Sequence, residues 1–551
     1  MPDLIVMWLP SSRPMGQSSI SSVRPSLSKG SPIVFALLAV IQLGCQHLGS
    51  GVQAPLCANL DDKLTHQWLK YEQASAYVAD HYAQETPELI ERADWEDRLI
   101  AHPGCQLSDK ELQQLRDRQE ARVAESRIRA AKLSRFDLDR VRQQSKLVQR
   151  LCREIPKGGL LHIHPSGTVT VDLLREVLQK HNPIVDGQDL IQRVGGLTLY
   201  PEERAFLQKW PKGRRFKSAP RADQEKLLNL FVLSEKPASH PFTRFDVVFV
   251  LLDWLEEVVG KQKFDLMVYE DFLARAKKAG VSYVEFTRST GSRPNFAQVY
   301  PPLHQAFMQK FGIDVRWNGA FARTRSAEKN RKRLKALWDH AKENGGGEVL
   351  LGVDILGNET ETPFLENGQV IYGPVLAAKR GKLKEQVLPL QMTAHAGELG
   401  DPRNVRDAII FGAKRIGHGV LLLNDPVTLE WAKQNSIAIE NSQISNWKLG
   451  AVDRDQMHPF LRFLRLGLRV SLSTDDEGIF VSSIIDECVN AVEKTDITYF
   501  ELRQLWFNSL TEAFVNEEVK SRLLDQLEKQ LSDFELRATA YLPVRPPLDQ
   551  K

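Results

Sequence analysis

The sequence predicts an α/β protein: a (β/α)8 TIM barrel with an N-terminal helical extension. Short apolar runs alternate with longer segments of helical periodicity over residues 156–551. This alternation is typical of a parallel sheet in which a helix follows each strand. Four of the apolar runs end in histidine or aspartate. Because barrel enzymes carry their catalytic residues at the carboxyl ends of the strands, these ends predict an active site.

Residues 1–54 have the pattern of an export signal. A basic flank precedes the apolar run Ile33–Ile41, which is too short to span a bilayer. Cys45 follows a Leu-Gly pair that resembles the end of a lipoprotein signal, although Gln42 departs from the aliphatic residue expected there. We therefore expect an exported protein, either periplasmic and attached to the membrane through a lipidated Cys45, or simply secreted.

Residues 55–155 are expected to form the helical extension. Apolar residues such as Leu115, Val123 and Leu133 recur at broadly helical spacing. Basic side chains crowd the same stretch and are interleaved with acids, which favours a solvated helix face. The alternative is a contact between two copies of the chain, that is, a homodimer through the N-terminal helices.

Composition and cysteine usage narrow the classes of partner. The chain has 551 residues, of which 42% are hydrophobic, and a net charge of +3, too close to neutral to favour a nucleic-acid partner. The five cysteines include no C-x-x-C pair, so a cysteine zinc site is not expected. In an exported protein Cys57 could pair with Cys105, and the alternative is that both stay unpaired.

The barrel is predicted to begin with a strand at Gly159–His164. Residues 165–245 follow as an insertion, and an insertion after the first strand lies at the catalytic face, where it would form a cap. Residues Val247–Lys278 are then expected to be helical, and helices over Tyr499–Leu531 close the chain. The remaining strands are expected at Val281–Phe286, Ile313–Phe321, Val349–Leu356, Leu388–Ala394, Arg415–Gly419, Ile437–Asn441 and Leu468–Thr474.

The first strand carries His162 and His164. Side chains two apart on a strand point to the same side, here the mouth of the barrel. Two imidazoles placed in this way can share one metal ion. The same spacing also arises by chance and in packed cores, so the pair alone is weak evidence.

Three later strand ends add to this pattern. His395 ends the fifth strand, and Glu398 follows it through two small residues. His418 lies between two glycines, which allow a ligand to approach the backbone closely. Asp475 and Asp476 are adjacent carboxylates that repel each other, so a cation or hydrogen-bond donors are expected near them. A helix N-cap pair is the alternative for these two aspartates.

Together the strand ends predict a catalytic metal centre. Three histidines and one aspartate, with a water in the open position, fill the coordination shell of Zn²⁺. Metal-activated water is what a hydrolase of this kind requires.

These motifs resemble those of the adenosine/AMP deaminase family. The resemblance runs from about Pro156 to Leu531, and the helical extension with its export signal resembles the secreted adenosine deaminase-related growth factor branch. The matching pieces, in chain order, are Leu161–His164, Gly352–Glu359, Thr393–Glu398, Arg415–Gly419, Ile439-Glu440, Ser445-Asn446 and Ser473–Asp476.

The resemblance implies zinc-dependent hydrolytic deamination of adenosine or 2′-deoxyadenosine to inosine or 2′-deoxyinosine, with release of ammonia. It implies that Zn²⁺ is bound by His162, His164, His395 and Asp475. The alternatives are another aminopurine substrate such as AMP, whose phosphate the basic stretch 212–221 would bind, and a non-catalytic nucleoside-binding barrel.

The resemblance also implies roles for the other motif residues. Glu398 would be protonated and pass a proton to N1 of the purine. His418 and Asp475 would orient the attacking hydroxide and accept its proton. Asp476 would hold N7, and the Gly357 amide would meet N3.

The sequence departs from the family pattern near the expected sugar site. Ser166, which with His164 would contact the substrate, stands where many members carry aspartate for a ribose hydroxyl. Glu477 stands where proline commonly follows the aspartate pair. These departures leave the sugar preference open, whereas the metal ligands and the proposed acid are all retained.

Overall fold

The structure is a computed structural model that describes residues 57–84, 87–100, 105–233, 241–289, 296–342, 345–384 and 390–545. The expected export signal, including Cys45, lies outside the described residues. In the described part of the chain, no helix combines the length and the apolar character that crossing a membrane requires.

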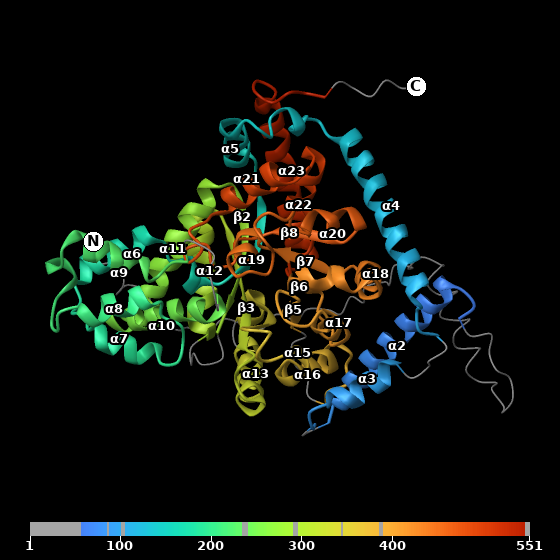
Figure 1. Ribbon diagram of the computed structural model, residues 1–551, viewed down its shortest axis with the longest axis horizontal. Helices are drawn as coiled ribbons and strands as arrows, with labels where there is room; N and C mark the ends of the chain where they lie inside the picture. The colour runs from blue at the N-terminus through green and yellow to red at the C-terminus, as the bar shows by residue number, and fades with distance from the viewer. Residues whose placement is uncertain are drawn as a thin grey trace, which may run out of the picture. The chain divides into compact units, whose positions relative to one another are not determined.

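Eight parallel strands form a single sheet whose order, β1 to β8, follows the chain. A parallel bridge between Ile163 and Asp475 joins the end of β1 to the segment after β8. The predicted (β/α)8 barrel is confirmed (Figure 1). The strands are β1 (Gly158–Ile163), β2 (Val281–Arg288), β3 (Asp314–Ala322), β4 (Leu350–Leu356), β5 (Gln391–Ala396), β6 (Arg415–His418), β7 (Ala438–Asn441) and β8 (Arg469–Leu472).

The strand pairing explains why the motifs converge. All six residues of β1 are buried, as expected for parallel strands covered on both faces, which read as continuous apolar runs. In the register between β5 and β6, His395 pairs with Gly417 and Ala396 with His418. The carboxyl ends of neighbouring strands therefore lie side by side, and so do the histidines that end them.

Helices surround the barrel between consecutive strands. Val247–Lys278 is helical as expected, but in two helices, because Gly260, with φ +89°, separates α10 (Pro241–Val259) from α11 (Lys261–Lys278). Glycine adopts this backbone conformation without the steric cost that other residues meet. The later helices are α12 (Phe296–Phe311), α13 (Ala327–Lys342), α14 (Gly346–Val349), α15 (Phe364–Asn367), α16 (Gln369–Lys379), α17 (Arg403–Ile410), α18 (Pro426–Gln434), α19 (Gln443–Lys448), α20 (Phe460–Leu466), α21 (Ile484–Lys494), α22 (Tyr499–Thr511) and α23 (Glu517–Ala538).

The helices between β1 and β2 form a lobe on one side of the barrel, at the left of Figure 1. This lobe has its own cluster of buried apolar side chains, which includes Leu174, Leu207, Leu228 and Phe245. It therefore packs as a small helical layer in addition to the barrel core. After the short turn η3 (Pro165–Thr168) its helices are α6 (Val171–His181), α7 (Gly187–Val194), α8 (Pro201–Lys209), α9 (Arg221–Asn229) and α10.

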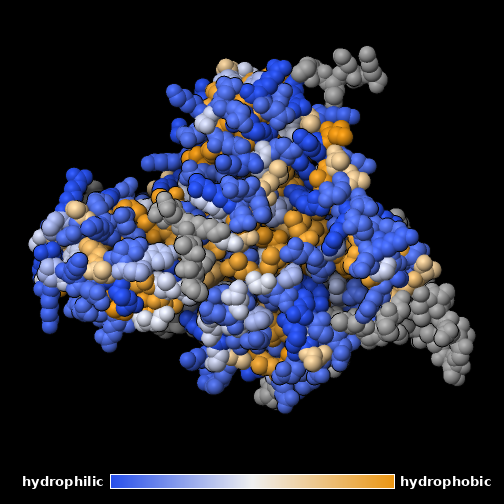
Figure 2. Space-filling model, viewed as in Figure 1, coloured by the Kyte–Doolittle hydropathy of each residue, from blue (hydrophilic) through white to orange (hydrophobic). Residues whose placement is uncertain are grey.

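The helices before β1 share the core of the barrel. Val78, Trp95 and Phe136 belong to the same buried cluster as the strands. The exposed side of the long helix α4 is mostly hydrophilic (Figure 2), with Ile128 and Leu133 as exposed apolar residues near its end, and its arginines form ion pairs, such as Arg122 with Glu430 of α18. This agrees with a solvated helix face. The helices are α2 (Leu60–His81), α3 (Arg92–Ile100), α4 (Asp109–Leu133) and α5 (Ser145–Glu154).

Two disulfides are present among the described residues. Cys57 pairs with Cys105, the pairing that the sequence left open. Cys152 of α5 pairs with Cys488 of α21, at a sequence separation of 336 residues, and sequence reasoning did not anticipate this bond. The second disulfide links the helical extension covalently to the barrel.

Candidate active site

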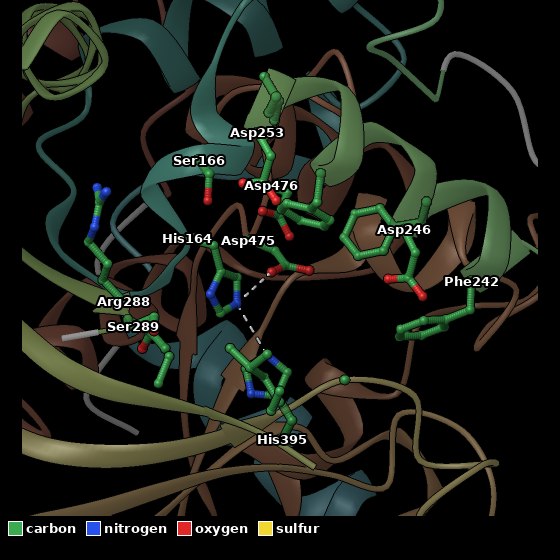
Figure 3. Close-up of a pocket in the computed structure, with 18 of the residues that line it drawn as sticks. His164, Ser166, Phe242, Asp246, Asp253, Arg288, Ser289, His395, Asp475 and Asp476 are labelled. Carbon is green, nitrogen blue, oxygen red and sulfur yellow. Dashed lines mark hydrogen bonds and ion pairs between the residues drawn. The ribbon is translucent and has the colours of Figure 1, made fainter. Parts of the chain in front are cut away.

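A cavity of about 320 Å³ opens at the carboxyl ends of the strands. Its floor carries His164, His395, His418, Glu398 and Asp475, each from or beside a strand end. Figure 3 shows His164 directed toward both Asp475 and His395. The site therefore lies where the strand-end motifs predicted it.

The four expected metal ligands converge on one point. His164 Nε2 lies 3.2 Å from Asp475 Oδ1 and 3.2 Å from His395 Nε2, and His162 Nε2 lies 3.5 Å from the same carboxylate oxygen. All four side chains are buried. The Nε2 atom of His162 is buried without a hydrogen-bond partner, which is costly unless a cation or proton occupies the point between these groups.

Buried carboxylates orient two of these histidines from behind. Glu440 Oε2 lies 2.8 Å from His162 Nδ1, and Asp354 Oδ1 lies 3.0 Å from His395 Nδ1. Each carboxylate accepts the Nδ1–H, so the lone pair of Nε2 points to the centre, as in protein metal sites. Burial raises the pKa of Asp354, but the contact with His395 outweighs it and lowers that pKa to about 2.

Two residues of the site have left-handed backbone conformations. Asp475 has φ 60° and His418 has φ 65°, which costs a residue other than glycine on the order of 1–3 kcal/mol. Hydrogen bonds hold Asp475 in place, from its own amide to His162 O (3.1 Å) and from Ser445 Oγ to Asp475 Oδ2 (2.7 Å). These hydrogen bonds hold Asp475 in a strained backbone conformation that directs its carboxylate into the cavity.

Glu398 lies beside this cluster in a buried position, 4% exposed. The amide groups of Gly397 and Glu398 both donate to Glu359 at 2.9 Å, which fixes the turn after β5. Burial raises the pKa of Glu398 well above its ordinary value, and the negative charges of Asp475 and Glu359 raise it further. Burial and these charges thus favour the neutral carboxyl, the form of Glu398 that can donate a proton.

The expected substrate contacts also line the cavity. Ser166, Gly357 and Asp476 are among its walls, and Asp476 Oδ1 is a buried polar atom without a hydrogen-bond partner. Gly357 has φ +107°, a conformation that favours glycine, and this brings its backbone to the cavity wall. The basic stretch 212–221 lies in the cap and does not line this cavity.

One face of α10 forms a wall of the cavity that sequence reasoning missed. Four apolar and three acidic side chains of this helix face the cavity, at helical spacing. Figure 3 shows Phe242, Asp246 and Asp253 on this helix. The spacing was visible in the sequence, but it indicates only one face of a helix and not what the face covers. These residues are Phe242, Phe245, Asp246, Phe249, Leu252, Asp253 and Glu256.

Comparison with known proteins identifies the family. The adenosine deaminase family model matches residues 213–530. The adenosine deaminase of Enterococcus faecalis is 27% identical over 317 residues, covering 56% of this chain and 87% of that protein. The adenosine deaminase of Klebsiella pneumoniae is 30% identical over 287 residues, covering 50% and 81%.

Among solved structures, an adenine deaminase from Arthrobacter aurescens superposes with a TM-score of 0.50 at 20% identity, covering 68% of this chain and 99% of that one. This likeness concerns the fold alone. The sequence matches support a hydrolytic deaminase, and the buried His/Asp cluster is able to bind the metal on which the family depends. The chain belongs to the adenosine deaminase family.

Proposed function

We propose that this protein is a zinc-dependent hydrolase that deaminates adenosine and 2′-deoxyadenosine to inosine and 2′-deoxyinosine, with release of ammonia. The observation that carries the proposal is the convergence of His162, His164, His395 and Asp475 beside the buried Glu398, whose pKa is raised. Relatives named adenosine deaminase support the choice of substrate.

The donor set fits zinc. Three imidazole nitrogens and one carboxylate oxygen are ligands that Zn²⁺ accepts, with a further position open to solvent. Bound zinc would supply a water whose pKa is lowered to near neutrality. The orphaned Nε2 of His162 is the atom that most needs such an ion.

The chain's own groups would bind and activate the base. Glu398 would pass its proton to N1 of the purine, which weakens aromaticity at the carbon that is attacked. Burial and the charge of Asp475 raise the pKa of Asp476, so its neutral carboxyl would donate a hydrogen bond to N7, and the Gly357 amide would donate to N3. Asp475 and His418 would orient the attacking oxygen. Ser166 and His164, which line the same cavity, would face the ribose.

The assay for this proposal is the ultraviolet absorbance change as adenosine becomes inosine. The variant Glu398→Gln is expected to keep its bound zinc and lose roughly 10²- to 10⁴-fold in kcat, because the general acid is absent. An unchanged rate in this variant would refute the role of Glu398. Bound zinc without any turnover in the wild-type protein would instead favour a nucleoside-binding barrel.

AMP is the second candidate substrate. Arg325 and Ser289 line the cavity and would bind a phosphate, whereas the carboxylates Asp246 and Asp253 on α10 would repel it. We expect adenosine to be preferred, and Arg325→Ala to change the ratio of the two kcat/KM values little. A strong preference for AMP that is lost in Arg325→Ala would overturn this choice.

We also propose that the chain is exported, with residues 55–155 as a helical extension of the catalytic barrel. The two disulfides support export, because such bonds persist in oxidising compartments. Sequencing the N-terminus of the mature protein tests it. Cleavage before Cys45 with an acylated cysteine would establish the lipoprotein form, and an intact residue 1 would contradict export by a cleaved signal.

A further inference from the structure

A chain of three hydrogen bonds runs from the backbone of α20 into the active-site cavity. The amide of Phe460 donates to His458 Nδ1 at 3.2 Å. His458 Nε2 lies 3.0 Å from Asn446 Oδ1, and Asn446 Nδ2 lies 2.8 Å from His418 Nδ1. His458 and Asn446 are both buried, so water does not compete for these contacts.

The first bond determines the tautomer of His458. A backbone N–H can only donate, so His458 Nδ1 accepts and carries no proton. The neutral ring therefore carries its proton on Nε2. Burial lowers the pKa of His458 to about 3, which agrees with a neutral ring.

The second bond determines the orientation of the Asn446 amide. Because His458 Nε2 donates, Asn446 must turn its oxygen toward that ring. Its NH₂ group then faces the catalytic side, 2.8 Å from His418 Nδ1 and 3.5 Å from Glu398 Oε1. An amide nitrogen only donates, so His418 Nδ1 is an acceptor.

The third bond gives His418 a role different from that of the metal ligands. With Nδ1 accepting, neutral His418 carries its proton on Nε2, and a protonated ring nitrogen neither binds a metal nor takes a proton. Distance alone does not exclude His418 as a metal ligand, since one of its nitrogens lies within 4.8 Å of ligand atoms of His162, His395 and Asp475. The Nδ1 atoms of His162 and His395 donate to carboxylates at 2.8 and 3.0 Å, whereas the nearest carboxyl oxygen to His418 Nδ1, Glu398 Oε1, lies 3.6 Å away, beyond hydrogen-bond distance.

We propose that His458 is a positioning residue that acts through Asn446 to hold His418 as an Nε2–H donor toward the attacking oxygen. His418 thus orients this oxygen by donating a hydrogen bond. The resemblance implied that His418 and Asp475 both accept the proton of the attacking water, whereas this tautomer removes His418 from that role. This proposal rests on the proposed deaminase function.

The tautomer is measured directly by ¹⁵N NMR on histidine-labelled protein, with the His418 signals assigned from the variant His418→Gln. We expect the proton on Nε2 of His418 in the wild-type protein, with and without added zinc. In His458→Leu the amide of Asn446 loses its anchor, so the His418 signals shift toward the other tautomer. A proton on Nδ1 of His418 in the wild type, or no shift of its signals in His458→Leu, would overturn the proposed role of His458.

Kinetics supply the second measurement. His458→Leu is expected to lower kcat for adenosine roughly 10- to 100-fold, less than the complete loss of an electrostatic donor, while KM and bound zinc stay within about twofold. His458→Gln is expected to restore most of kcat, because its carboxamide both accepts from Phe460 and donates to Asn446. The control His304→Leu removes a half-buried histidine of α12 whose Nδ1 meets Val315 O, and it should leave all these values unchanged.

The outcomes distinguish the two proposals. Parallel losses of zinc and kcat in His458→Leu, or no advantage of glutamine over leucine, would reduce His458 to a packing role. A wild-type protein that binds zinc and does not deaminate adenosine would contradict the proposed function. The tautomer of His418 measured by NMR would still test whether His458 and Asn446 position that ring.

Discussion

Single carboxylates behind the histidines control the affinity of the metal site. Asp354→Asn removes the charge that accepts the Nδ1–H of His395, although the side chain keeps its shape. We expect zinc to bind roughly 10- to 100-fold more weakly, because partners of this kind contribute that much to metal affinity. Competition with a chromogenic chelator measures the change, and wild-type affinity in this variant would contradict the assignment.

The neutral His458 makes the protein sensitive to acid. Burial lowers the pKa of His458 to about 3, whereas the unfolded residue titrates near 6.5. The unfolded state therefore binds a proton first as the pH falls below that value, and stability is lost between pH 6.5 and 3. At pH 4.5 the loss should be about 2–3 kcal/mol.

Denaturant unfolding of the wild type and of His458→Gln at pH 7.5 and 4.5 tests this. The variant should lose less stability than the wild type over this interval, because it has no group that titrates there. Equal losses in the two proteins would show that other groups cause the acid sensitivity.

At the scale of elements, an ion pair holds two ligand-bearing turns together. Arg275 of α11 pairs with Glu477 and donates from its other nitrogen to Thr168 O in η3 at 2.9 Å. Glu477 also accepts from Thr474 Oγ1 at 2.9 Å. The turn after β1, with His164, and the turn after β8, with Asp475, are thereby fixed to one helix. The ion pair supplies rigidity at a position where proline is common in the family.

Glu477→Gln and Arg275→Met should each release zinc about tenfold faster, because the spacing between the ligands of the two turns loosens. The double variant should be little worse than either single one, since both remove the same contact. The matched control is Arg465→Met, which breaks a buried pair with Glu501 between α20 and α22. If that variant releases zinc as fast for an equal loss of stability, the ion pair of Arg275 has no specific role.

At the scale of the whole molecule, the Cys152–Cys488 bond closes a far longer loop than the Cys57–Cys105 bond, 336 against 48 residues. Loop-closure entropy grows slowly with length, so Cys152→Ser should cost roughly 1–2 kcal/mol more stability than Cys57→Ser. Denaturant midpoints measured without reductant compare the two. A larger loss in Cys57→Ser would show that local packing outweighs loop length.

The sequence contained enough to predict the barrel and to place the proposed metal ligands at one end of it. Each strand is a local apolar run, and His162, His164, His395 and Asp475 occur at strand ends, so parallel topology alone brings them to the same end of the barrel. The boundary between α10 and α11 was harder to predict from the sequence, because the helical pattern of apolar residues continues on both sides of Gly260.

The sequence by itself determined the architecture and placed the proposed metal ligands and the proposed acid Glu398 at or beside strand ends, since periodicity and strand ends are local properties of the chain. Only the tertiary structure decided the bond between Cys152 and Cys488 and the ion pair of Arg275 with Glu477. It also decided the direction of the hydrogen bonds that lead from His458 through Asn446 to His418. These depend on groups that lie far apart in the chain, as the 202 residues between Arg275 and Glu477 illustrate. The direction of a hydrogen bond depends on which atom meets which, and folding alone establishes that.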